Sequence, residues 1–219
     1  METPEHYNAA YFAWQQSVGE TGAALEKWKF SPFLSPSDSV LEFGCGGAYL
    51  LCALTCRERW GIDINPAARL EAQKSVNAVR TVNDLPEEMR FDKIISNHAL
   101  EHVETPITEL RALRERLSPQ GRLIFVVPSE TWRMHKHFDP LNKNQHLHTW
   151  TPLLLGNLLV RAGFRVERTE LLCNRWPPRA TFLMRILPLP IVHLIARTFA
   201  AVSGYRELRV VASSNSYAG

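Results

Sequence analysis

Hydrophobic and polar positions along this chain alternate between two periods. Short apolar runs, typical of buried strands, are separated by stretches whose apolar residues recur every three or four positions, as in helices. The run 122–127 (RLIFVV) is the most evident strand. Six further strand candidates cover residues 39–43, 60–64, 79–82, 91–96, 164–172 and 208–212.

End signals predict helices between these strands. Thr105-Pro106 and Thr151-Pro152 each combine an N-cap residue with a first-turn proline, and Gly163 ends the second of these helices. Other predicted helices cover residues 5–30, 48–59 and 66–76. Strands that alternate with helices of this length predict a parallel α/β sheet with helices on both faces. Ligands of such sheets bind at the carboxyl ends of the strands.

The proline- and serine-rich stretch 31–39 separates two expected parts of the chain. Residues 1–38 are predicted to form an N-terminal helical cap, and residues 39–219 to form the main domain. A variable apolar and basic segment, 176–204, lies between the last two strand candidates of that domain.

Charge is unevenly distributed. Residues 1–160 carry 16 Lys and Arg against 19 Asp and Glu, whereas residues 161–219 carry 9 against 3. A basic end mixed with apolar residues fits a solvated basic surface, or else an anionic or membrane-surface partner.

One apolar stripe at helical spacing lies in the basic end of the chain. Its members are Ile191, Leu194, Ile195, Phe199 and Val202. Such a stripe packs on its own domain or, alternatively, makes peripheral membrane contact through residues 181–204. No membrane span is expected there, because charged and proline residues interrupt the run.

The four cysteines show no paired spacing, and the first residues are polar rather than basic and then apolar. Both features predict a reduced, cytoplasmic setting.

The chemically informative stretch is 40–48 (VLEFGCGGA), in which a strand runs into a glycine-rich turn that opens a helix. Gly44 and Gly46 allow the backbone to turn tightly and to approach a ligand closely. Asp63 ends the next strand, where an acid can accept hydrogen bonds from both hydroxyls of a ribose.

Two features separate this turn from a dinucleotide-binding turn. Tyr49 stands where the third glycine of that fingerprint would be, and a bulky group there disfavours pyrophosphate. Glu42 puts negative charge beside the turn, which suits an amino group and repels a phosphate.

Several motifs in order resemble those of the class I S-adenosylmethionine-dependent methyltransferases, in their small-molecule branch. They are VLEFGCGG, GIDINP, FDKIISN and LEHV, with SPQGRL following the next helix. The resemblance runs from about residue 39 to residue 128 and, more weakly, to residue 170. It implies a Rossmann-like, mostly parallel seven-stranded sheet with helices on both faces, and S-adenosyl-L-methionine as cofactor.

The resemblance also implies the cofactor-binding residues. They are Glu42, Gly44, Cys45, Gly46, Asp63, Ile64, Asp84 and Asn97. Glu42 and the glycines would hold the methionine end, Asp63 the ribose and Ile64 the adenine, which either Asn83 or Asp84 would also meet. Asn97 would lie beneath the sulfonium.

Six of the eight histidines fall in two segments after the fourth and fifth strands, where the methyl acceptor is expected. An oxygen acceptor must lose its proton, and histidine is a common base. The catalytic candidates are His98, which is favoured as the nearest, and then His146 and His148. A metal site built from His135, His137, His146 and His148 is an alternative, although no metal is expected.

The sequence therefore predicts an enzyme that methylates a small-molecule or lipid-linked acceptor, on oxygen and with a histidine base. A nicotinamide-dependent oxidoreductase and a non-catalytic methyltransferase-like partner subunit are the alternatives. No nucleic-acid partner is expected, because the fourth strand ends in SNHA rather than in the Asn-Pro-Pro-Tyr of enzymes that methylate nucleobase amines.

Overall fold

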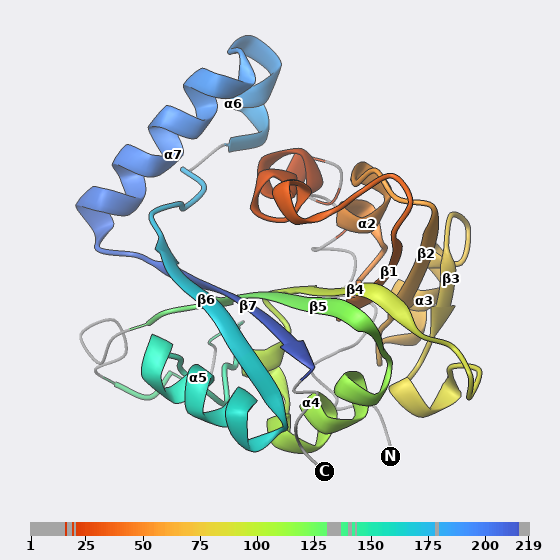
Figure 1. Cartoon of the computed structure of the whole chain (residues 1–219). Coiled ribbons are helices and arrows are strands. Elements are labelled where there is room, and N and C mark those ends of the chain that lie inside the picture. The colour runs from red at the N-terminus through yellow and green to blue at the C-terminus, as the bar shows by residue number, and fades with distance from the viewer. Residues whose placement is uncertain are drawn as a thin grey trace.

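One seven-stranded sheet organises the chain (Figure 1). The computed structural model describes residues 16, 19, 21–130, 137–139, 142, 144–177 and 180–214. The strands are β1 (Ser39–Phe43), β2 (Glu58–Ile62), β3 (Asn77–Val79), β4 (Phe91–Asn97), β5 (Leu117–Pro128), β6 (Phe164–Leu172) and β7 (Glu207–Ser214). Their order is β3-β2-β1-β4-β5-β7-β6, and only β7 runs antiparallel to its neighbours. The predicted mostly parallel sheet is confirmed.

Helices connect the strands in the expected alternation. They are α2 (Tyr49–Ala53), α3 (Pro66–Ala72), α4 (Pro106–Glu115), α5 (Pro152–Arg161), α6 (Ala180–Ile186) and α7 (Leu189–Ser203). Short 3-10 helices are η1 (Lys27–Lys29), η2 (Ser31–Phe33), η3 (Val82–Asp84) and η4 (Leu100–His102), and residues 21–26 are helical. Thr151 caps α5 by accepting a hydrogen bond from the Leu154 N–H at 3.2 Å, whereas Thr105 makes no such side-chain bond at α4.

Both faces of the sheet are covered, because successive residues of the central strands point to opposite sides. Ile94 and Phe125 belong to the core shared with α4 and α5. The neighbouring residues Ile95 and Val126 belong to the core shared with α2 and α3. The apolar runs read as strands are thus buried on both sides, as in doubly covered parallel sheets.

Several predicted boundaries were wrong, among them the ends of the strands predicted over 60–64 and 122–127 and of the helix predicted over 66–76. Two others show the reason. The helix expected over 48–59 ends at Ala53, since Leu54 is extended and β2 already begins at Glu58, which pairs with Ser39. The third strand covers 77–79 and not 79–82, because η3 begins at Val82. In each case pairing with a neighbouring strand decided the boundary, and local sequence does not encode that pairing.

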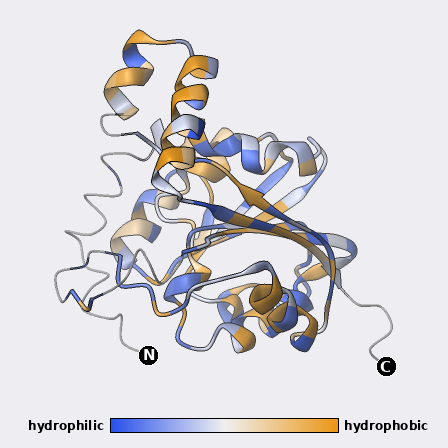
Figure 2. Cartoon of the chain, turned by 90° about the vertical axis from the view of Figure 1, so that its left-hand side faces the viewer, coloured by the Kyte–Doolittle hydropathy of each residue, from blue (hydrophilic) through white to orange (hydrophobic). Residues whose placement is uncertain are grey.

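The helices α6 and α7 form an arm between β6 and β7 that stands clear of the sheet (Figures 1 and 2). At its base Leu25, Ala180 and Val192 are buried together. The arm leaves the sheet where β6 ends, and Glu207 of β7 pairs there with both Leu172 and Pro128. The arm therefore lies at the carboxyl edge of the parallel strands. Among the described residues, no helix combines the length and the apolar character needed to cross a bilayer.

Candidate functional site

The glycine turn after β1 is held tightly between two strands. The N–H groups of Gly44 and Cys45 donate to the Ile62 carbonyl at 2.8 and 3.0 Å. Gly44 has φ +73°, and a Cβ there would lie 2.3 Å from the Cβ of Ala99 in the segment after β4. Only glycine fits this position, so the turn leaves bare backbone at the carboxyl edge, as the sequence predicted.

Asp63 lies against this turn at the end of β2. One carboxylate oxygen accepts a hydrogen bond from the Gly46 N–H at 2.8 Å, and the other from the Asn65 N–H at 2.8 Å. Burial raises the pKa of Asp63, and these two bonds offset part of that rise. The next residue, Ile64, is 41% exposed, so an acid and an apolar surface stand side by side at the edge.

Glu42 is a buried carboxyl at the end of β1. Its Oε2 has no hydrogen-bond partner among the described residues. Burial raises the pKa of Glu42 to about 8, and the negative charge of Asp63 adds to the rise. The Oδ1 of Asn97, at the end of β4, is likewise buried without a partner. Two buried oxygens in need of donors fit a cationic amine, such as that of the methionine end of the expected cofactor.

The raised pKa of Glu42 predicts a pH-dependent affinity for S-adenosylhomocysteine. A bound ammonium favours the carboxylate, so binding must release the proton that Glu42 holds below about pH 8. Affinity should therefore rise by up to about tenfold from about pH 6 to pH 7, as measured by calorimetric titration. Glu42→Gln should bind more weakly and without this slope; an unchanged slope in the variant would exclude Glu42 as the group that titrates.

The side chains of two other cofactor-binding residues implied by the resemblance contact other parts of the protein. The Cys45 thiol is buried, and a Cβ on Gly61 would lie 2.5 Å from its sulfur; its side chain therefore packs on β2. The Asp84 carboxylate accepts bonds from the N–H and the hydroxyl of Thr81, both at 2.8 Å, and so caps η3. Asn83 is exposed.

His98 follows β4 in a left-handed conformation with φ +56°. Its Nε2 lies 2.9 Å from Glu207 Oε1, and its Nδ1 lies 3.4 Å from Glu101 Oε1. Burial alone lowers the pKa of His98, but hydrogen bonds and charges from the two carboxylates raise it to about 10. In this environment His98 holds its proton at neutral pH, which is the opposite of what a general base requires.

A buried chain of charges, which was not predicted from the sequence, continues behind His98. Glu207 also pairs with the fully buried Lys29 at 2.6 Å, and Lys29 pairs in turn with Glu26. Glu26 accepts hydrogen bonds from the Trp176 indole at 2.6 Å and from the Asn97 amide at 3.4 Å. The only sequence signal is a lysine between two aromatic residues in EKWKF.

The segment that contains His146 and His148 is bonded onto the turn after β4. The N–H groups of Leu147 and His148 donate to the Glu101 carbonyl at 2.9 and 3.1 Å. The His148 Nε2 donates to the Val103 carbonyl at 2.8 Å, which anchors this ring to the turn after β4. His148 thus fixes the position of this segment.

His146 has a different environment. Its Nδ1 lies 2.9 Å from Glu130 Oε2, just beyond β5, so the carboxylate holds a proton on Nδ1 and leaves the Nε2 lone pair to accept another. The His146 ring meets the His102 ring edge-on, with centroids 4.9 Å apart. A carboxylate, an oriented imidazole and a second imidazole thus meet beside the end of β4.

The same place has the geometry of a metal site. Glu101, His102 and His146 each offer one ligand atom, and these atoms lie within 4.8 Å of one another. Of the four histidines in the predicted alternative cluster, His146 is in this group and His148 bonds Val103. His137 is exposed and is not in this group, and His135 falls outside the described residues. Proton transfer and metal binding are thus both compatible with these three side chains.

Comparison with known proteins gives a family match over most of the chain. Residues 20–169 match the model of the methyltransferase domain family. The ubiquinone biosynthesis O-methyltransferase of Pseudomonas syringae is 36% identical over 98 residues, which are 39% of this chain and 42% of that protein. Its counterpart in Cereibacter sphaeroides is 31% identical over 99 residues, 39% of each chain. The chain thus matches about two fifths of the length of these relatives.

Solved structures share the fold over nearly the whole chain. An S-adenosylmethionine-dependent methyltransferase from Archaeoglobus fulgidus has a TM-score of 0.63 at 18% identity, covering 92% of this chain and 98% of that one. A chain in the complex of the Haloferax volcanii Trm112 methyltransferase activator with a methyltransferase has a TM-score of 0.66 at 18% identity, covering 93% and 97%. At such identities the likeness concerns the fold alone.

Proposed function

The chain belongs to the class I S-adenosylmethionine-dependent methyltransferases, and on that basis we propose that it methylates a hydroxyl oxygen of a small-molecule or lipid-linked acceptor, with His146 as the general base. The chain is therefore an enzyme and not a nicotinamide-dependent oxidoreductase or a non-catalytic subunit. The observation that carries the finer proposal is the Glu130–His146 pair beside the end of β4.

When bound, S-adenosylmethionine supplies a methyl group on a positively charged sulfur, ready for in-line transfer to a nucleophile. Glu42 and Asn97 offer buried acceptor oxygens for the ammonium of the methionine end. The bare turn at Gly44 and Gly46 admits the ligand closely, and Asp63 would accept from the ribose hydroxyls. Ile64 is exposed beside Asp63 and would cover the adenine. Asp84 and Cys45 remain predicted cofactor-binding residues. Cys45 would contact the cofactor through its backbone.

His146 is assigned the base on geometry. Its Nδ1 is oriented by Glu130, so Nε2 can take the proton from the acceptor hydroxyl as the oxygen attacks. Among the other two predicted bases, His148 donates its Nε2 proton to Val103, and His98 is held between two carboxylates.

Oxygen is the proposed acceptor atom for two reasons. A histidine oriented by a carboxylate serves an acceptor that must lose a proton, and the two curated relatives named above are O-methyltransferases of ubiquinone biosynthesis. An acceptor with a hydrophobic tail would also suit the arm at the same sheet edge. The division into a cap, residues 1–38, and a main domain, residues 39–219, stays part of this proposal.

Titration with S-adenosylhomocysteine tests the cofactor assignment. Asp63→Ala should weaken binding at least about 100-fold, because two hydrogen bonds to a charged group are lost at about 1.5–3 kcal/mol each. Glu88→Ala, an exposed acid beyond η3, should bind as the wild type does. Wild-type affinity for NADH in place of S-adenosylhomocysteine would contradict the proposal. A panel of phenols, alcohols, carboxylic acids and amines is then incubated with radiolabelled S-adenosylmethionine. Only phenols or alcohols should be methylated, and the products should be methyl ethers.

A further inference from the structure

The arm exposes apolar side chains on a helix that is already apolar on its buried side. Val192, Ala196 and Ala200 of α7 are buried. On the opposite side Leu194 is 65% exposed and Val202 is 85% exposed. A helix that is apolar on two opposite sides is normally enclosed, and Figure 2 shows both arm helices largely apolar and outside the body of the protein. Within the part of the chain that the structure describes, the outer side of α7 therefore lacks the apolar cover that its composition calls for.

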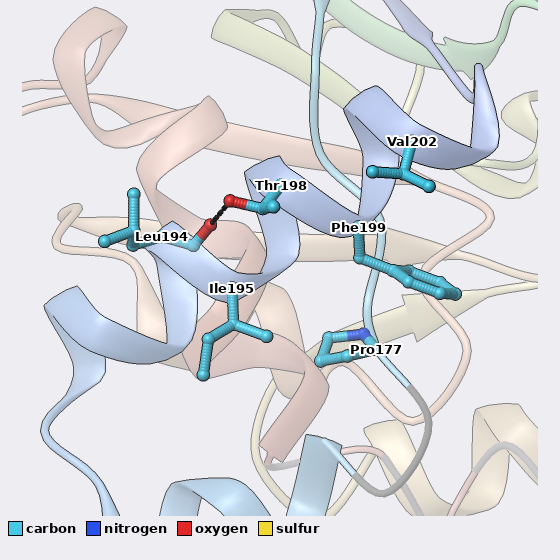
Figure 3. A pocket seen from close by; sticks show the side chains of 6 residues that line it. All are labelled: Pro177, Leu194, Ile195, Thr198, Phe199 and Val202. Atoms are coloured by element: carbon cyan, nitrogen blue, oxygen red, sulfur yellow. Dashed lines mark hydrogen bonds between the residues drawn. The ribbon is translucent and has the colours of Figure 1, made fainter.

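A shallow hollow on the arm presents hydrocarbon only. It is lined by Pro177, Leu194, Ile195, Thr198, Phe199 and Val202 (Figure 3). The one hydroxyl among them, that of Thr198, donates to the Leu194 carbonyl at 3.0 Å and needs no other partner. An occupant of this hollow must therefore be apolar, and an acyl chain satisfies it without hydrogen bonds.

The segment that carries this apolar face is basic. Residues 174–206 contain five arginines and no aspartate or glutamate. The Arg175 guanidinium lies over the Phe199 and Tyr205 rings, at 5.4 and 5.2 Å from their centroids, and so stands beside the hollow. Arg185 and Arg197 are exposed on α6 and α7. Arginines around an exposed apolar helix face complement anionic headgroups above acyl chains.

We propose that the arm docks on the surface of an anionic lipid bilayer, with Leu194 and Val202 entering the acyl region and arginines meeting the headgroups. The arm leaves the carboxyl edge of the sheet, at Leu172 and Glu207, and Glu207 also contacts His98. Docking thus holds the acceptor side of the enzyme next to the membrane. The inference rests on the proposed function, because a lipid-linked methyl acceptor would be held in the same bilayer on which the arm docks.

Vesicle flotation tests the inference on the full chain. Binding should be strong to vesicles of phosphatidylcholine with phosphatidylglycerol and weak to phosphatidylcholine alone. The double substitution Leu194→Glu and Val202→Glu should reduce binding about tenfold or more, because it removes two apolar anchors and adds negative charge. Raising NaCl from about 0.1 M to 1 M, which shortens the Debye length from about 10 Å to 3 Å, should also weaken it.

The matched control is Leu153→Glu on α5, where leucine is 71% exposed on a different helix. It should leave vesicle binding unchanged. Equal loss in this variant, or no binding of the wild type to anionic vesicles, overturns the inference. So does a wild type that only self-associates and becomes monomeric in the double variant. S-adenosylhomocysteine affinity, measured on each variant, separates the two proposals. If the wild type binds S-adenosylhomocysteine but not vesicles, the membrane-docking inference is rejected and the proposed methyltransferase function is not.

Discussion

Replacing His146 by alanine is expected to lower kcat about 10²- to 10⁴-fold, the usual contribution of a general base. S-adenosylhomocysteine affinity should change little, because His146 lies on the acceptor side of the edge. The expectation rests on the Glu130 carboxylate, which lies 2.9 Å from the His146 Nδ1 and leaves Nε2 to take the proton. Single-turnover methyl transfer to the acceptor found in the panel measures it.

His148→Ala is the matched comparison for this prediction. That histidine is two positions away and donates to Val103, so its loss should loosen the segment and affect KM more than kcat. Glu130→Gln should lower kcat less than His146→Ala, since the base survives with a poorer orienting partner. An unaffected rate in His146→Ala removes it from the mechanism. Rate loss on chelation, restored by a divalent cation, would assign Glu101, His102 and His146 to a metal instead.

Lys29→Met is expected to destabilise the fold by about 3–5 kcal/mol, the usual cost of removing one partner of a buried ion pair. Burial lowers the pKa of Lys29, yet the charges of Glu207 and Glu26 outweigh this and leave it raised. Methionine fits the space but leaves both carboxylates buried without their cation. For a chain of 219 residues the loss corresponds to a Tm lower by roughly 6–20 °C, measurable by calorimetry.

A triple variant separates charge from packing in this test. Adding Glu26→Gln and Glu207→Gln to Lys29→Met removes the orphaned charges, and stability should recover in large part, because neutral replacements of buried ion networks are often tolerated. Lys74→Met, at an exposed pair with Glu71, should unfold as the wild type does. If Lys29→Met proved as stable as Lys74→Met, the buried ion chain would not contribute to the stability of the fold.

The geometry of the cofactor side could largely be predicted from the sequence, because its residues lie in short motifs at the ends of neighbouring strands. Gly44 and Gly46 are fixed by one turn, and Asp63 ends the strand that pairs beside it. The strands β1 and β6 matched their predicted ranges, 39–43 and 164–172. In both, a glycine marks one end, Gly44 after β1 and Gly163 before β6, so the local signal and the final pairing agreed.

The acceptor side could not be read in the same way. His98 and Glu207 are 109 positions apart, and His146 and Glu130 are 16 apart across the segment after β5. Sequence alone ranked His98 first by its nearness to the cofactor turn. The folding of β7 beside β5 brings Glu207 to His98, and the return of the segment after β5 brings His146 to Glu130. These contacts are the basis on which we propose His146 in place of His98. Lys29 shows the same limit, since its partner Glu207 arrives from the last strand.

Glu26 has a further consequence, because its two oxygens contact two different parts of the fold. One accepts from Trp176 at the root of the arm, and the other from Asn97 at the end of β4. A displacement of Trp176 must therefore redistribute the hydrogen bonds of a residue that would touch the ligand. If docking shifts Trp176, thermodynamic reciprocity demands that a ligand at Asn97 alter lipid affinity by the same factor as lipid alters ligand affinity.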